Sequence, residues 1–110
     1  TMKSISKELF LMIGADLSNY LKLSLQRALL GNVTPNIRCV AVILDAKNIQ
    51  LSFYYDGEFT DCDEELASEV ETEIIADFDD DFIISTHLER LDYPKPIKIN
   101  NGYCVYLRKE

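Results

Sequence analysis

The chain has 110 residues, of which 47% are hydrophobic, so it is long enough to fold around a single core. Its 19 acidic and 11 basic residues give a formal net charge of −8 at pH 7, and this balance argues against nucleic acid as a partner, because affinity for phosphates comes from Lys and Arg. No apolar run approaches the roughly 18 residues of a membrane-spanning helix, so we expect a soluble protein without membrane attachment.

The first predicted element is a helix that starts after Asp16, a favourable N-cap residue. Apolar residues then recur at the helical period as far as Leu29, and Gly31 ends the helix. Residues 1–15 form either a separate short helix or a flexible segment. With no repeat or linker elsewhere, we expect residues 1–110 to be a single domain.

The middle of the chain predicts two strands and a second helix. Residues 37–44 are rich in β-branched side chains, residues 49–55 alternate between apolar and polar, and the four residues between them favour a turn. Thr60 or Asp61 caps a helix that continues to about Phe78, with Leu66, Ala67, Val70, Ile74 and Phe78 on its apolar side.

Residues 82–91 and 103–108 read as two further strands, separated by a segment in which Pro94 and Pro96 interrupt regular structure. The resulting order is α-β-β-α-β-β. It predicts an α+β fold with a small antiparallel four-stranded sheet and helices packed on one face.

Residues 56–81 contain thirteen Asp or Glu and no Lys or Arg. A helix face selected only for solubility would mix both signs of charge and gain ion pairs, although a simple solvated face remains the alternative interpretation. An ordered acidic surface suits a basic partner. The predicted partner-binding residues are the acids of this surface and three apolar or aromatic anchors: Asp56, Glu58, Asp61, Glu64, Glu65, Glu69, Glu71, Tyr54, Ile75 and Tyr93.

Catalytic and metal-binding patterns are weak in this chain. The four acids between Asp77 and Asp81 lack the spacing and the glycine of an EF-hand loop, and the single histidine, His87, has no partner that the sequence identifies. The cysteines Cys39, Cys62 and Cys104 are odd in number and scattered, which predicts free thiols in a reducing compartment. We expect no enzymatic activity and no cofactor.

Several segments resemble small immunity proteins of bacterial contact-dependent growth-inhibition systems. The segments are residues 30–38 (LGNVTPNIR), 53–58 (FYYDGE), 63–78 (DEELASEVETEIIADF), 90–94 (RLDYP) and 105–110 (VYLRKE), so the resemblance covers residues 28–110. It implies a cytoplasmic antidote that binds the C-terminal toxin domain of a secreted effector. Toxins of such systems are often nucleases with basic clefts, which an acidic protein can cover.

A secretion chaperone is the alternative interpretation. Such chaperones are also small, acidic α+β proteins without catalytic motifs, but they generally dimerise and hold an unfolded effector segment along an apolar groove. An enzyme that works through carboxylates is a third hypothesis and would require a pocket containing an acid of raised pKa.

Overall fold

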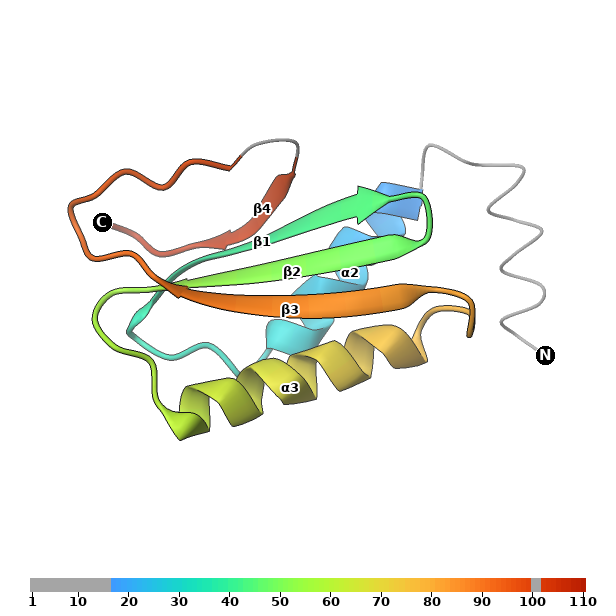
Figure 1. The fold of residues 1–110 in the computed structure, drawn as a ribbon, viewed down its shortest axis with the longest axis horizontal. Coiled ribbons are helices and arrows are strands. Elements are labelled where there is room, and N and C mark those ends of the chain that lie inside the picture. Colours follow the sequence, from blue (N-terminus) through green and yellow to red (C-terminus); the bar gives the residue numbers. More distant parts are fainter. Residues whose placement is uncertain (1–16, 100–101) are drawn as a thin grey trace.

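A computed structural model describes residues 17–99 and 102–110, so the expectation for residues 1–15 lies outside the described residues. The described elements are α2 (Leu17–Leu29), β1 (Ile37–Asp45), β2 (Asn48–Tyr55), α3 (Asp61–Ala76), β3 (Ile83–Arg90) and β4 (Tyr103–Leu107). The predicted α-β-β-α-β-β order is therefore confirmed for this part of the chain, and Figure 1 shows the elements. None of the described helices is long and apolar enough to cross a membrane.

Strands β1 and β2 form the predicted hairpin, in register from Asp45 opposite Asn48 to Cys39 opposite Tyr54; the register then shifts, so that Ile37 is opposite Tyr55. The alternation of β2 is also as predicted, because the side chains of Ile49, Leu51, Phe53 and Tyr55 are buried and the residues between them are not. Ala46, in the turn, has a backbone φ of 54°, a left-handed conformation that is unfavourable for a residue with a Cβ atom.

The sheet is mixed, and the prediction of a purely antiparallel sheet is wrong. The strand order is β3-β2-β1-β4, with β3 parallel to β2 and the other two pairs antiparallel. The cause is α3, whose 16 residues span about 24 Å, close to the length of an eight-residue strand. The helix thus carries the chain back along β2, and β3 starts beside the beginning of β2 and runs in the same direction.

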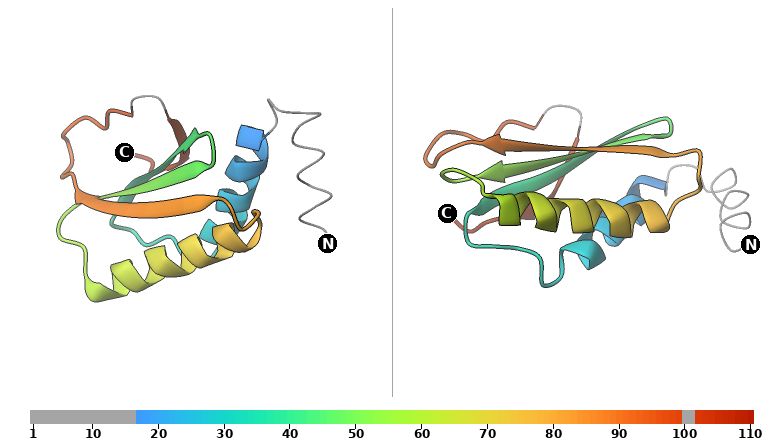
Figure 2. Two further views of the ribbon diagram at one scale, coloured as in Figure 1. Left: turned by 45° about the vertical axis from the view of Figure 1, so that its right-hand side comes forward. Right: turned by 60° about the horizontal axis from the view of Figure 1, so that its bottom comes forward.

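Both helices lie on the same side of the sheet (Figure 2). Their buried side chains share one core cluster with the inner faces of β1 and β2, including Leu25 of α2, Val70 and Ile74 of α3, Val40 of β1 and Phe53 of β2. This arrangement leaves two surfaces available outside the core. One is the outer side of the helices, and the other is the helix-free face of the sheet.

Candidate functional site

The outer side of α3 carries the strongest concentration of charge. Thr60 caps the helix, and its side chain and that of Asp63 form a reciprocal capping box. From that fixed start, five acids are exposed on the outer side, and we call them the acidic stripe: Asp61, Glu64, Glu65, Glu69 and Glu73. Four of the five follow one another at intervals of four residues, which places them as neighbours along one side of the helix.

The acidic stripe has no ion pair with any Lys or Arg of residues 17–99 or 102–110. Like charges four residues apart destabilise a helix, and the last turn of α3 contains no base that would compensate the negative end of its dipole. Glu65, Glu69 and Glu73, which lie beyond the first turn, therefore lower the stability of α3, whereas Asp61 and Glu64 lie in the first turn, where the helix dipole favours negative charge. This cost points to a role outside folding.

Other acids of the same block are bonded within the chain. Six of these acids form ion pairs or hydrogen bonds. The contacts join Asp56 to Arg108 at 3.1 Å, Glu58 to Arg90 at 3.5 Å, Asp63 to Thr60 and Asn36, Glu71 to Thr86 at 3.0 Å, Asp77 to Ser24 and Arg27, and Asp81 to Lys47. Their charges are thus partly neutralised or used to connect elements. Only the acidic stripe presents unpaired carboxylates as a group within the described residues.

Four of the predicted site residues, Asp61, Glu64, Glu65 and Glu69, lie in the acidic stripe. Glu71 is half-buried between α3 and β3, where its carboxylate accepts the hydrogen bond from Thr86. The sequence pattern missed Glu73, although its spacing of four residues from Glu69 was the signal that could have found it.

The position of Ile75 on α3 limits its exposure. A partner-binding anchor on this helix should be exposed, but the side chain of Ile75 is half-buried and packs against the core cluster. The reason is that β3 covers this flank of α3, so the buried arc of the helix is wider than its apolar stripe alone indicates. Part of its surface is therefore covered, and its role as a partner contact stays a prediction.

The remaining predicted anchors lie away from the stripe. Tyr54 is half-buried on the helix-free face, because its neighbours along β2 point into the core. Tyr93 is 55% exposed in the segment after β3, where its backbone N–H donates to Asp56 and its ring lies 5.7 Å from the guanidinium of Arg38. Since α3 covers the opposite face of the sheet, Tyr54 cannot share one flat interface with the acidic stripe.

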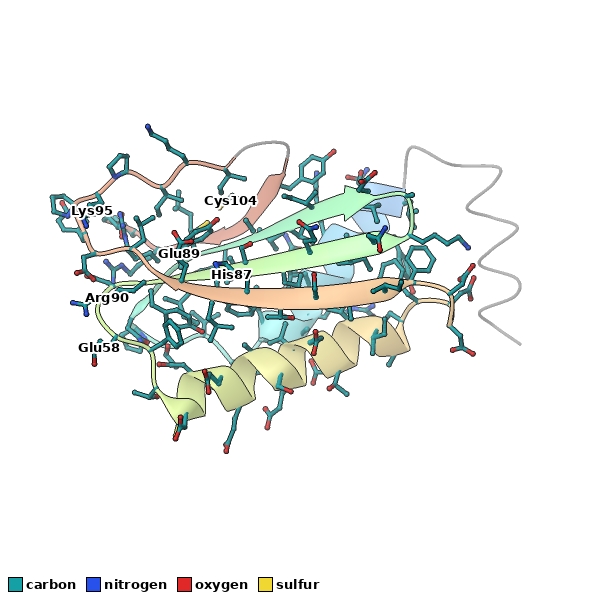
Figure 3. All side chains as sticks on the ribbon, in the orientation of Figure 1. Glu58, His87, Glu89, Arg90, Lys95 and Cys104 are labelled. Atoms are coloured by element: carbon teal, nitrogen blue, oxygen red, sulfur yellow. The ribbon has the colours of Figure 1, made fainter. Side chains whose placement is uncertain are left out.

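His87 is too far from Cys104 to form a catalytic Cys-His pair with it. His87 is exposed on β3, with its Nε2 3.3 Å from Glu89, while Cys104 lies on β4 at the other edge of the sheet (Figure 3). The register runs from His87 through Ser52 and Ala41 to Cys104. Three strand spacings amount to about 14 Å, so these two residues cannot act together.

No three His, Cys, Asp or Glu among the described residues are arranged to hold a metal ion. Glu58 and Arg90 form an ion pair at one end of the sheet (Figure 3), and Arg90 donates a hydrogen bond to Asp92 at 3.0 Å. Hydrogen bonds from Arg90 and from the N–H of Gly57 lower the pKa of Asp92. These contacts fix the loop after β3 and do not resemble a catalytic site.

A second exposed surface, which the sequence analysis missed, lies on α2 and just beyond its end. Leu23 is 59% exposed and Leu30 is 78% exposed, and both border shallow apolar grooves; we call these two residues the α2 patch. A further groove between α2 and α3 is lined by residues that include Arg27 and Glu73. Arg27 also lines the groove of Leu23 and Leu30, so this residue links the α2 patch to Glu73 of the acidic stripe.

A small α+β domain that exposes an acidic helix beside an apolar patch, without a catalytic cluster in its described part, has the features of a protein-binding module. Residues 18–110 match the family model described as MafI2 immunity protein, and the chain therefore belongs to this family. No curated protein matches the chain. Immunity proteins of polymorphic toxin systems bind a cognate toxin and are generally not enzymes. The match supports this broader class and not the contact-dependent growth-inhibition family that the segments resembled.

Proposed function

We propose that this protein neutralises a cognate toxin domain by binding it through the acidic stripe, and that the toxin is a nuclease with a basic substrate-binding cleft. The observation that carries the proposal is the row of exposed, unpaired carboxylates on α3, in which Glu65, Glu69 and Glu73 repel one another at intervals of four residues. A nuclease cleft is basic because it binds phosphates, so the charges of the two surfaces are complementary.

Charge and apolar contact have separate roles in this interface. Long-range attraction between the acidic stripe and a basic cleft raises the association rate, which can reach about 10⁸–10⁹ M⁻¹s⁻¹ at low salt. Buried apolar anchors slow dissociation. The α2 patch, with Leu23 and Leu30, is linked to the stripe through Arg27, which lines the grooves beside both, and it supplies such anchors.

The site of action in this proposal is the cytoplasm, where the immunity protein meets the C-terminal toxin domain of an effector delivered by a sibling cell. Direct coverage of the nuclease cleft prevents binding of its substrate. Asp56, Glu58, Tyr54 and Tyr93, which lie outside the stripe, remain predicted contacts at the margin of the interface or with a second part of the toxin.

The test is co-expression with the effector domain encoded beside this protein. We expect a stoichiometric complex after purification, survival of cells that express the toxin, and loss of nuclease activity in vitro. A complex that forms while the toxin remains active would reject direct neutralisation, and the absence of a complex with the folded toxin would reject the proposal as a whole.

The α2 patch also favours the alternative, a secretion chaperone that holds an effector segment along an apolar groove. This alternative predicts a dimer in sedimentation experiments and binding to an unfolded effector segment. A monomer that binds only the folded toxin domain rejects it.

A further inference from the structure

Two of the three cysteines meet on the helix-free face of the sheet. The Sγ atoms of Cys39 on β1 and Cys104 on β4 are 3.2 Å apart, although 65 positions separate the two residues in the sequence. Cys39 is completely buried, whereas Cys104 is exposed. The third cysteine, Cys62, is exposed on α3. Figure 3 shows Cys104 on β4, at the edge of the sheet.

A β-bulge brings the two sulfur atoms together. Cys39 is opposite Leu107, but the register then shifts, so that Ala41 is opposite Cys104 and Val105 is the extra residue. In a regular ladder Cys104 would be opposite Val42, whose side chain points into the core. Bulges redirect the side chains beside them, and this one turns Cys104 to the face that Cys39 occupies.

We propose that Cys39 and Cys104 form a peroxide-reactive site that converts to a cross-strand disulfide. The exposed Cys104 thiolate attacks the O–O bond of hydrogen peroxide, giving a sulfenic acid and one water after proton uptake. The sulfur of Cys39 then attacks the sulfenic sulfur, the S–O bond breaks, and the released hydroxide leaves with the Cys39 proton as a second water. Two thiols are oxidised and one peroxide is reduced, a transfer of two electrons.

The environment assigns these roles to the two cysteines. Burial, together with the hydrogen bond to Cys104, raises the pKa of Cys39 to about 12, so Cys39 remains a protonated thiol until the sulfenic acid forms beside it. Cys104 is the residue that solvent and peroxide can reach. A disulfide between them ties the short edge strand β4 to β1, on the face opposite the acidic stripe. This inference therefore does not depend on the acidic stripe.

The experiment treats the reduced full-length protein with a small excess of hydrogen peroxide. We expect reactive thiols to fall from three to one, the mass to decrease by two hydrogen atoms, and a digest to contain the Cys39 and Cys104 peptides joined. The melting temperature should rise by roughly 10 °C and return to its initial value with dithiothreitol. Three surviving thiols, a sulfinic acid at Cys104, or dimers linked through Cys62 would each overturn the proposal.

Two variants serve as a matched pair, because both replace an exposed cysteine and leave the core unchanged. Cys104→Ser should abolish the intramolecular crosslink and the rise in melting temperature. Cys62→Ser should preserve both. A crosslink in Cys104→Ser, or its loss in Cys62→Ser, would show that a different pair of thiols reacts.

Discussion

The guanidinium of Arg38, buried at the start of β1, holds the carboxylate of Glu110 through two hydrogen bonds of 2.7 and 2.9 Å. A third hydrogen bond from Arg38 reaches the carbonyl oxygen of Leu91 at 2.6 Å, and Arg108 also donates to Glu110. This network joins the beginning of the sheet, the segment after β3 and the residues after β4. We expect it to be a main determinant of how the C-terminal part of the chain is held.

Replacing Arg38 by methionine tests this network. The change removes the side-chain donor of the Leu91 carbonyl and leaves the Glu110 carboxylate with Arg108 as its remaining donor, so we expect the free energy of unfolding in urea to fall by about 2–3 kcal/mol. Arg27→Met is the matched control, because Arg27 makes a solvent-exposed ion pair with Asp77 and its loss should cost less than about 1 kcal/mol. Equal losses in the two variants would contradict the structural role of Arg38.

The pH dependence of stability follows from the same contacts. The hydrogen bond from Arg38 lowers the pKa of Glu110 in the folded protein below its ordinary value of 4.5. A carboxylate with a depressed folded-state pKa contributes stability above its unfolded pKa, and this contribution is lost as the pH falls through the folded value. Wild type should therefore lose its stability advantage over Glu110→Gln between about pH 5 and pH 2. A constant difference in urea midpoint over that range would refute the assignment.

Much of the fold followed from the sequence, because each predicted element had a local cause. The alternation of residues 49–55 located β2, and the Thr60 cap located the start of α3. The parallel pairing of β3 with β2 did not follow, since pairing depends on where a 16-residue helix carries the chain and not on the composition of the strand. The β-bulge at Val105 was equally invisible, because no glycine or local motif marks it.

Ala46→Gly should stabilise the protein. Ala46 has a φ of 54° in the β1–β2 turn, a conformation that costs a residue with a Cβ atom about 1–2 kcal/mol and costs glycine almost nothing. After the greater chain entropy of unfolded glycine is subtracted, we expect a gain of about 0.5–1 kcal/mol in urea denaturation. The same change at the exposed Ala76 in the last turn of α3 should be destabilising. A lower free energy of unfolding in both variants would show that the turn is not strained.

The candidate site was predictable only in part. The absence of bases in residues 56–81 identified an acidic surface, and four of its members belong to the stripe. The sequence could not show that Asp56 would pair with Arg108, because this partner is 52 residues away. Nor could it show that Arg27 of α2 and Glu73 of the stripe line one groove, since only the packing of α2 on α3 brings them together.

Neutralising the acidic stripe should separate stability from function. In Glu65→Gln/Glu69→Gln, the repulsion between charges four residues apart is removed, so a small rise in melting temperature is expected. Protection of cells against the toxin should weaken in the same variant, because steering toward a basic cleft is reduced. A variant with both lower stability and lower protection would instead indicate damage to the fold.

The most direct test of the central claim measures association rates with the purified toxin domain by stopped flow, at low and high salt. Glu65→Lys/Glu69→Lys changes the net charge of the acidic stripe by +4. Asp45→Lys/Glu89→Lys changes the net charge of the protein by the same amount at exposed positions outside the stripe. The proposal predicts association at least about 10-fold slower for the stripe variant at low salt, a small effect for the control, and convergence of the rates at high salt. Equal slowing in both variants would show that net charge matters and the stripe does not, and unchanged rates in both would contradict recognition through the acidic surface.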